Sequence, residues 1–181
     1  MPRDRSNLVW IDLETTGLSV GNRVILEIAS IVTDKDLNII AEGPDLVIQH
    51  SDETLSRIDS WCEQQHGGSG LLDESRASDI TLREAEQQTL TFVRRHTHRK
   101  IAPLCGNSIL LDRRFLMHYM PELHDHLSHR NVDVSVINEL AARWFPGVLA
   151  RLDKGVHHRA VDDILSSIDE LRFYRRRVFQ S

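Results

Sequence analysis

The sequence predicts an α/β fold, a mixed β-sheet flanked by helices. Two observations predict it. Residues 8–49 contain three apolar, β-branched runs separated by polar turns, which is typical of a meander of neighbouring strands. After residue 50, segments with helical spacing of apolar residues alternate with short apolar strands, which gives the element order β-β-β-α-β-α-β-α. Helices that connect strands in this order cover the faces of a sheet.

The three expected strands come first. The run Leu8–Gly17 begins as a strand and ends at a Thr-Thr-Gly sequence. A long second strand is expected over Val24–Asp34, followed by a tight turn at Lys35-Asp36. The third strand, Leu37–Gln49, is interrupted by Gly43-Pro44.

The helices follow from apolar spacing and from capping residues. One helix is expected over Asp52–His66, with Gly67–Gly70 breaking it and forming a mobile loop. Thr81–Glu84 fits a capping box that opens the next helix. The later elements are a strand at Ile101–Cys105, a helix at Ser108–Tyr119, a helical turn begun by Pro121, a strand around Asn131–Val134, a helix to Phe145, a polar loop from Pro146 to His157 and a last helix over Arg159–Val178.

Size and composition limit the class of protein. The 181 residues are most simply one domain, spanning 1–181, with a core of its own. Cys62 and Cys105 lack CxxC or zinc-ligand spacing, which indicates a reducing compartment without a disulfide framework. No apolar run approaches the about 20 residues that span a bilayer, and the polar segment Met1–Asn7 is unlike a signal peptide. We therefore expect a cytoplasmic protein.

The charge pattern bears on partners. The formal net charge is −5 at pH 7, and a basic stripe of the kind that holds a long nucleic acid is not evident. The densest basic cluster, Arg172 with Arg175–Arg177, lies at the end of the last expected helix, where it complements the helix dipole. A nucleic-acid substrate would therefore make few phosphate contacts.

Two carboxylates interrupt the first apolar run. Asp12 and Glu14 are two residues apart, so in a strand they point to the same face, about 6–7 Å apart. The Thr-Thr-Gly sequence after them places both acids at the C-terminal end of the strand. Two neighbouring acids repel each other unless a cation lies between them.

Further acids lie near the beginnings of two helices. Asp112 falls in about the first turn of the helix after Gly106-Asn107, where an acid also suits the helix dipole. Near the last helix, Asp163 precedes inward-facing Ile164 and is the better candidate for a half-buried acid. Asp162 looks more solvated, and the sequence leaves this choice open.

A histidine precedes the last helix. On one helix, His158 and Asp163 would differ by about 140° in direction, so they converge only if His158 lies in the loop before it.

Carboxylates from a strand and two helices offer hard oxygen ligands for Mg²⁺ or Mn²⁺, in a two-metal site with ions roughly 3.5–4 Å apart. Such ions would acidify a water and stabilise the leaving alkoxide of a phosphodiester. His158, with a free pKa near 6.5, could take the proton from that water.

These residues also carry a family resemblance. Asp12-x-Glu14 with Thr16-Gly17, then Asp112, His158 and Asp163, resembles the DEDDh class of 3′-to-5′ exonucleases and, within it, the oligoribonuclease family. Other stretches that resemble this family are Leu8–Leu18, Leu37–Pro44, Cys105–Ser108, Asp112–Leu116, Tyr119–Leu123 and Asp133–Ser135. The resemblance covers nearly the whole chain and implies a ribonuclease-H-like exonuclease fold. It implies that Asp12, Glu14, Asp112 and Asp163 hold two ions and that His158 is the general base.

The resemblance also implies a substrate and a partner. Members of the family are homodimers that degrade very short RNAs, especially dinucleotides, to 5′-mononucleotides. Leu18 would wedge between the two bases, and Trp61 would help form the base pocket. The residues that would cap the 5′ phosphate of the substrate are His66, Ser108, Arg130 and Ser135. Such a cap favours a short substrate, since a longer strand would have nowhere to continue.

The chain departs from the family pattern at a few positions. His129 stands where a tyrosine usually precedes the phosphate-binding arginine, Thr15 stands where methionine is common, and Gly67-Gly68 loosens the segment after His66. His129 could alter stacking on the substrate and the preferred substrate length. None of these positions is an expected metal ligand, so we expect activity to survive.

Two alternatives remain open at this point. Another DEDDh exonuclease, acting on the 3′ ends of longer single-stranded DNA or RNA, would carry the same acids and would prefer long strands to a dinucleotide. A catalytically silent nucleic-acid-binding module on the same fold would lose nothing on mutation of Asp12.

Overall fold

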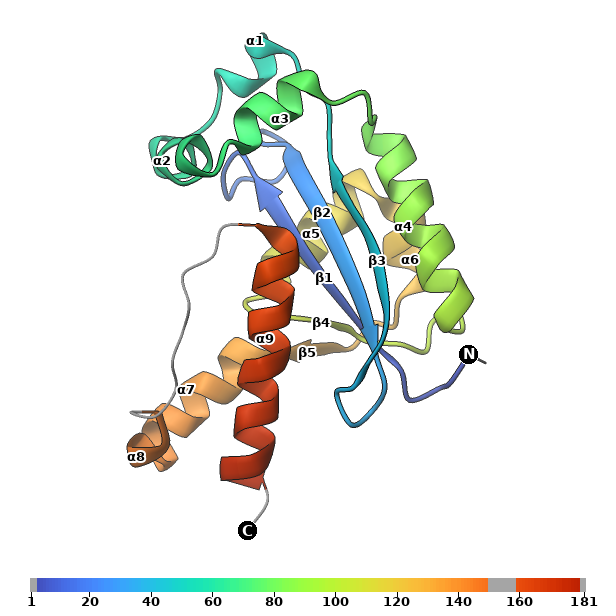
Figure 1. Cartoon of the computed structure of the whole chain (residues 1–181), viewed down its shortest axis with the longest axis vertical. Helices are drawn as coiled ribbons and strands as arrows, with labels where there is room; N and C mark the ends of the chain where they lie inside the picture. Colours follow the sequence, from blue (N-terminus) through green and yellow to red (C-terminus); the bar gives the residue numbers. More distant parts are fainter. Residues whose placement is uncertain (1–2, 150–158, 180–181) are drawn as a thin grey trace.

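A five-stranded mixed sheet forms the centre of the molecule (Figure 1). This computed structural model describes residues 3–149 and 159–179. The strands lie in the order β3-β2-β1-β4-β5, and their bounds are Leu8–Thr15 for β1, Ile25–Thr33 for β2, Ile39–Val47 for β3, Leu104–Gly106 for β4 and Asn131–Asp133 for β5. β1, β2 and β3 are antiparallel, while β4 and β5 run parallel to β1. The predicted mixed sheet is confirmed.

Helices cover both faces of this sheet. Their bounds are Asp52–Leu55 for α1, Ser60–Ser69 for α2, Leu71–Ala77 for α3, Leu82–His96 for α4, Leu110–Tyr119 for α5, Pro121–His126 for α6, Val134–Trp144 for α7, Pro146–Leu149 for α8 and Ala160–Tyr174 for α9. A π-helical turn, η1, continues α9 over Arg175–Phe179. Within the described residues, none of the helices has the length and apolar character needed to cross a membrane.

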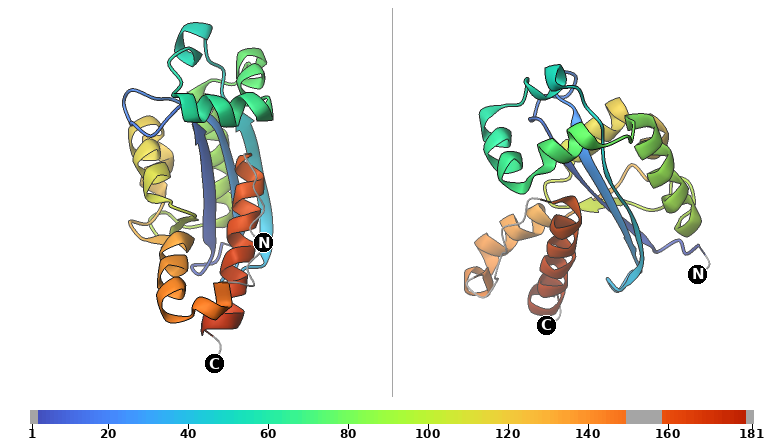
Figure 2. Two further views of the ribbon diagram at one scale, coloured as in Figure 1. Left: turned by 90° about the vertical axis from the view of Figure 1, so that its left-hand side faces the viewer. Right: turned by 45° about the horizontal axis from the view of Figure 1, so that its top comes forward.

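The alternation of β1 separates two cores. Val9, Ile11 and Leu13 are buried with residues of α4, α5 and α6, such as Phe115. Trp10 points to the other face and is buried with residues of α7 and α9. Figure 2 shows the strands between α5 and α9. Asp12 and Glu14 share the face of Trp10, so they lie on the side of the sheet that α9 covers.

The segment after β3 differs from the expectation of one helix over Asp52–His66. It forms two helices, α1 and α2, because Asp59 adopts an extended backbone and its side chain accepts the amide of Cys62, which starts a new helix. The loop expected at Gly67–Gly70 is also wrong. α2 continues through Gly67 and Gly68 to Ser69, and its C-cap residue Gly70 has a left-handed φ of 78°. A third helix, α3, follows at once.

Two other regions bear on the expected elements. The capping box at Thr81 and Glu84 is confirmed, with both reciprocal hydrogen bonds present. The loop expected from Pro146 to His157 begins instead with the short helix α8. The rest of that expected loop lies outside the described residues.

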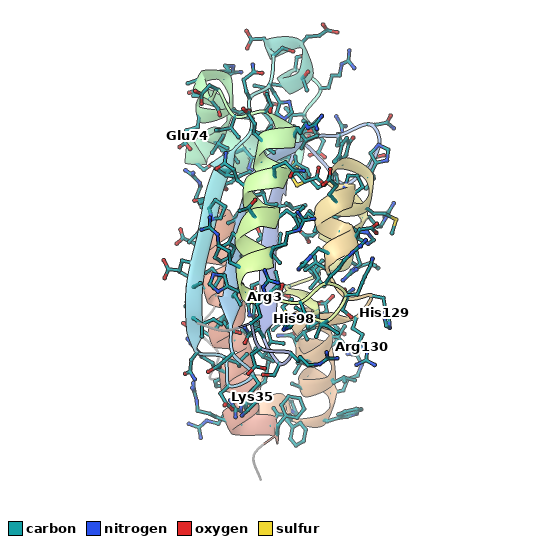
Figure 3. The ribbon with its side chains drawn as sticks, turned by 90° about the vertical axis from the view of Figure 1, so that its right-hand side faces the viewer. Arg3, Lys35, Glu74, His98, His129 and Arg130 are labelled. Atoms are coloured by element: carbon teal, nitrogen blue, oxygen red, sulfur yellow. The ribbon has the colours of Figure 1, made fainter. Side chains whose placement is uncertain are left out.

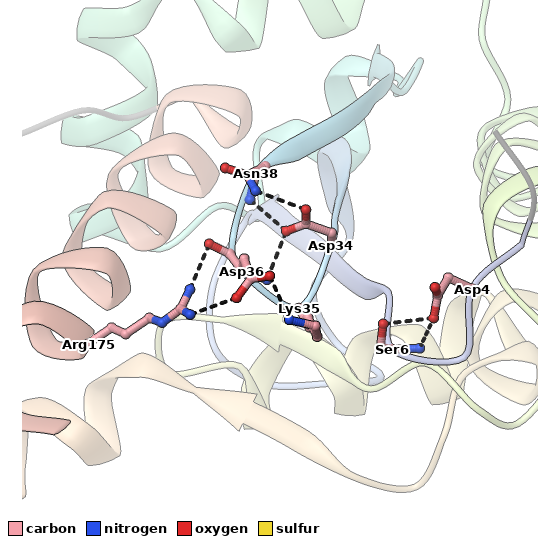
Figure 4. A network of polar contacts seen from close by, with 7 residues as sticks. All are labelled: Asp4, Ser6, Asp34, Lys35, Asp36, Asn38 and Arg175. Atoms are coloured by element: carbon pink, nitrogen blue, oxygen red, sulfur yellow. Dashed lines mark hydrogen bonds and ion pairs between the residues drawn. The ribbon is translucent and has the colours of Figure 1, made fainter. Parts of the chain in front are cut away.

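The β2–β3 turn is held by a polar network that reaches the end of the last helix (Figure 4). Asp34 accepts hydrogen bonds from the amides of Asp36 and Asn38 at 2.8 and 2.9 Å. Arg175 donates to the Asp36 carboxylate at 2.6 Å and to its carbonyl at 3.0 Å. The C-terminal end of α9 is thereby tied to the sheet, and its N-terminal end lies beside Asp12 and Glu14.

Candidate active site

Three carboxylates meet where the end of β1 faces the first turn of α9. One carboxylate oxygen from each of Asp12, Glu14 and Asp163 lies within 4.8 Å of the others. α9 packs against β1 and β2, and this packing brings together residues about 150 positions apart in the sequence. Asp163 is partly buried and faces the strand acids, whereas Asp162 is exposed. The sequence left open whether Asp162 or Asp163 is the half-buried acid, and the structure shows that it is Asp163.

Asp112 comes from the opposite face of the sheet. It is buried in the first turn of α5, and its Oδ1 accepts the backbone amide of Leu13 at 3.1 Å. Its charge acts on Asp12. Asp112 therefore lies beside the three-carboxylate group and is fixed to the backbone between Asp12 and Glu14.

The pKa values of these acids are raised because the site is buried and contains several carboxylates. Burial, followed by the charge of Asp163, raises the pKa of Glu14 to about 8. Burial raises the pKa of Asp112 to about 7, and burial with the charge of Asp112 raises the pKa of Asp12 well above its ordinary range. Carboxylates held this close favour either a bound proton or a cation. The all-oxygen donor set fits Mg²⁺ or Mn²⁺.

His66 contacts the C-terminal end of β1. It is buried on α2, its Nε2 donates to the carbonyl of Thr15 at 3.0 Å, and the same atom is 3.8 Å from Oε2 of Glu14. Asp59, the N-cap residue of α2, donates its amide to the Thr16 carbonyl at 3.1 Å. The structure therefore brings His66 to the acids.

A glycine makes this approach of α2 possible. Gly17 has a φ of 149°, and a Cβ there would collide with the Asp59 carboxylate and with Arg23. Gly17 is thus needed where the strand end meets the start of α2.

Ser108 and Ser135 are linked by one carboxylate. Asp133, the last residue of β5, accepts the amide of Ser108 at 3.0 Å, the amide of Ser135 at 3.0 Å and the Ser135 hydroxyl at 2.6 Å, all on Oδ1. The charge of Asp133 also acts on Asp112. Because β4 and β5 run parallel to β1, both serines lie at the end of the sheet that carries the acids.

His129 and Arg130 are not brought to the acids of their own chain. Both are exposed and precede β5, so they lie level with the start of β1 rather than its end. Arg130 stands about four strand residues, or about 13 Å, before the level of Asp12. Figure 3 shows His129 and Arg130 side by side and far from Glu74, which is paired to the start of α9.

The other expected site residues are placed as follows. Leu18 is 66% exposed in the loop directly after β1. Trp61 belongs to α2, but its side chain lies outside the described part of the structure, and His158 falls in the undescribed range 150–158.

Sequence reasoning missed Glu27, Asp133 and Arg159. Glu27 is fully buried on β2, directly opposite Glu14, and is paired to Arg159. A signal for Glu27 was present, since it is a lone acid within the apolar run of β2, and a buried charge requires a partner. Asp133 was noted only as part of the family-like stretch Asp133–Ser135, and Arg159 gave no such signal.

Comparisons with known proteins show the family of this chain. The RNase_T (Exonuclease) family model matches residues 9–171. An oligoribonuclease of Haemophilus influenzae (strain 86-028NP) is 50% identical over 175 residues, covering 97% of this chain and 96% of that protein. An oligoribonuclease of Shewanella loihica is 49% identical over 180 residues, covering 99% of each.

Solved structures show the same fold at lower identity. The zinc-bound Escherichia coli exonuclease I complex with single-stranded DNA matches with a TM-score of 0.75 and 16% identity. The match covers 98% of this chain and 42% of that one, so this chain spans about two fifths of the length of exonuclease I. The expected ribonuclease-H-like exonuclease fold is confirmed. From the family match and the half-identity over nearly its full length, the chain belongs to the RNase_T exonuclease family, among its oligoribonucleases, and is a 3′-to-5′ exoribonuclease.

Proposed function

We propose that this enzyme hydrolyses very short RNAs, dinucleotides above all, to 5′-mononucleotides with the aid of two divalent cations, Mg²⁺ or Mn²⁺. The observation that carries the proposal is the convergence of Asp12, Glu14 and Asp163 within 4.8 Å, with Asp112 beside them. These four carboxylates are the proposed ligands. Burial raises the pKa values of Asp12, Glu14 and Asp112, and the charges of neighbouring carboxylates raise them further. A bound dication would favour the ionised acids and so offset both effects, which supports this assignment.

Residues of this chain are proposed to have separate roles in the reaction. Bound cations would supply positive charge that acidifies the attacking water and stabilises the leaving oxygen. His158 is the proposed general base, since an imidazole with a free pKa near 6.5 accepts a proton at neutral pH. His66, whose Nε2 is 3.8 Å from Oε2 of Glu14, is proposed to contribute to the cap on the 5′ phosphate of the substrate. Leu18 and Trp61 are proposed to hold the two bases, and the exposure of Leu18 beside the acids supports its part.

The preference for short RNA is proposed to come from a cap on the 5′ phosphate. Ser108 and Ser135, fixed by Asp133 at the acidic end of the sheet, would form one side of it. Arg130 and His129 would form the other, and we propose that a second copy supplies them, because they lie far from the acids of their own chain. Arginine suits this task because its guanidinium binds a phosphate in two places.

We therefore propose a homodimer. Its interface would be formed by the edge strand β5 and the neighbouring helices α5 and α7. The large apolar side chains exposed on α5 and α7 support this surface: Leu110 (63%), Met117 (57%), Val136 (55%), Leu140 (39%) and Trp144 (65%). β5 is the edge strand of the sheet, and unpaired edges favour pairing with another chain. Arg130 directly precedes this strand.

The test is a time course on 5′-phosphate-labelled RNA, comparing a dinucleotide with a strand of about twenty nucleotides. Reactions with Mn²⁺, Mg²⁺ or chelator are run beside the His158→Ala variant. We expect rapid, metal-dependent loss of the dinucleotide, slow attack on the long strand and no turnover by the variant. Faster attack on the long strand would overturn the cap and favour an exonuclease for longer 3′ ends, with His129 as the first residue to examine.

A further inference from the structure

A buried glutamate lies next to the proposed metal ligands without belonging to them. Glu27 is on β2, directly opposite Glu14 in the β1–β2 register, and has no exposed surface. Opposed residues of antiparallel strands share a face, with Cβ atoms about 4.5–5.5 Å apart. The charge of Glu27 acts on both Asp12 and Glu14. A fifth carboxylate here would compete for the cations unless something else held it.

Glu27 is held by the start of α9. Its Oε2 accepts the amide of Ala160 at 3.0 Å, and its Oε1 accepts from Arg159, with Nε at 2.9 Å and Nη2 at 2.8 Å. Arg159 is the N-cap residue of α9, and its own side chain does not cap the helix. The cap is instead supplied by Glu27, from a strand more than 130 residues earlier. An acid at a helix N-terminus also complements the helix dipole.

Arg159 is fixed from a second side. Its Nη1 and Nη2 donate to the two oxygens of Glu74 on α3, at 2.9 and 3.0 Å. The Arg159 carbonyl accepts the amide of Asp163 at 3.1 Å, which is a hydrogen bond of the first turn of α9. The direction of Asp163 is thus set by a residue that is itself clamped between β2 and α3.

Glu27 and Arg159 have opposite electrostatic effects on the neighbouring acids. Burial and the charge of Glu27 raise the pKa of Asp45, on β3, to about 6. The positive charge of Arg159 opposes this effect and also acts on Glu14, whose pKa it lowers. Without Arg159, Glu27 would remain as an unpaired buried charge beside Glu14, and such a charge is costly.

We propose that Glu27 and Arg159 are positioning residues for the metal centre: they fix Asp163 relative to Asp12 and Glu14 and keep the Glu27 carboxylate out of the ligand set. This inference rests on the proposed metal site. It assigns the pair a part in cation affinity rather than in substrate binding. The groups that hold and orient metal ligands are commonly worth about 10- to 100-fold in metal affinity or activity.

The experiment measures Mn²⁺ binding directly, from the electron paramagnetic resonance signal of free Mn²⁺, beside kcat and KM for a dinucleotide. For Arg159→Met we expect Mn²⁺ binding weaker by about 10- to 100-fold and a fall in kcat that added Mn²⁺ partly restores. KM at saturating Mn²⁺ should stay within about twofold of wild type. Arg159→Lys keeps the positive charge but cannot bind Glu27 and Glu74 at the same time. Its Mn²⁺ affinity and kcat should lie between those of the wild type and Arg159→Met. It replaces Arg159→Met in the experiment if that variant does not fold.

The chain offers a matched control in Glu86. This buried glutamate on α4 caps α6 from a distance, accepting the amides of Glu122 at 2.7 Å and Leu123 at 3.2 Å, on the other face of the sheet. Glu86→Gln should lower the thermal midpoint and leave Mn²⁺ affinity unchanged. If Arg159→Met and Arg159→Lys lower the midpoint in the same way and bind Mn²⁺ like wild type, the pair is only structural and the inference is overturned. Failure of the proposed function is distinct, because the wild-type protein itself would then not bind Mn²⁺.

Discussion

The two ends of the short strands β4 and β5 differ. The C-terminal ends lie at an acidic cluster that one chain forms by itself, whereas the N-terminal end of β5 lies away from that cluster. At their C-terminal ends, Ser108 and Ser135 converge on Asp133, beside the acids of β1 and α9. At the N-terminal end of β5, His129 and Arg130 extend into solvent with no acid cluster near them among the described residues. Residues 130 and 135 are close in sequence, yet the strand between them separates them.

We infer from this difference that the proposed cation binding and the proposed length selection have separate origins. The proposed ligands all come from one chain, so a monomer has what it needs to bind metal. The proposed phosphate cap needs both ends of β5, and one chain cannot bring its two ends together. Variants at the two ends should therefore fail in different ways.

The largest effect is expected at the acidic end. Asp12→Asn should lower kcat on the dinucleotide by about a thousandfold or more, since even groups that only support metal ligands are worth about 10- to 100-fold. The fold should persist, because burial already disfavours the Asp12 charge. Turnover in excess Mn²⁺, with circular dichroism on the same sample, measures both. Wild-type turnover by this variant would remove Asp12 from the metal centre.

A smaller effect is expected at the other end. Arg130→Ala should lower kcat/KM for the dinucleotide by about 10- to 100-fold, because a hydrogen bond to a charged group is worth about 1.5–3 kcal/mol. Mn²⁺ binding should not change. Arg57→Ala, which removes an exposed arginine paired to Glu53 on α1, is the control and should behave like wild type.

Mixing variants decides which chain supplies Arg130. After subunit exchange between Asp12→Asn and Arg130→Ala proteins, a mixed dimer holds one site with an intact Asp12 and an intact Arg130 from its partner. Equal mixing should then restore about a quarter of wild-type activity. No recovery, with exchange verified by mass, would mean that Arg130 acts on its own chain or not at all.

Local patterns predicted the features that depend on neighbouring residues. The shared face of Asp12 and Glu14 follows from strand alternation, and the burial of Asp163 over Asp162 follows from the inward Ile164. The mistake at Gly67-Gly68 has a tertiary cause. Glycine costs a helix about 1 kcal/mol, but the Asp59 cap and the burial of His66 hold α2 together.

The convergence of Asp12, Glu14 and Asp163 was predicted from the kinds of residue present, but individual long-range hydrogen bonds could not be predicted from the sequence. The hydrogen bonds that Glu27 and Asp133 accept from the amides of Ala160 and Ser108 join residues 133 and 25 positions apart, and the hydrophobic periodicity of the sequence does not indicate such pairs. The remote position of Arg130 also escaped prediction. A strand of three residues is enough to carry Arg130 away from Ser135, and this depends on the parallel register with β4.

The smallest effect concerns stability at the acidic end and follows from the pKa of Glu14. In the metal-free folded protein this pKa is raised to about 8 from an ordinary value of 4.5, so between these pH values the folded state binds more protons than the unfolded chain. The contribution of Glu14 to the free energy of unfolding is therefore fully present below about pH 4.5 and is lost as the pH rises through 8. Glu14→Gln cannot ionise and also relieves Asp12.

Metal-free Glu14→Gln should thus unfold at nearly the wild-type temperature near pH 5 and at a higher temperature at pH 8, where a gain of about 1 kcal/mol corresponds to about 2–4 °C. Scanning calorimetry in chelator measures the difference, and Glu63→Gln, an exposed change on α2, should show no such trend. Added Mn²⁺ should reverse the order at pH 8, because it stabilises the wild-type folded state by binding it and finds a ligand missing in the variant. A metal-free difference that does not grow with pH would mean that the Glu14 charge is already compensated within the chain, and the cation would then be needed for chemistry alone.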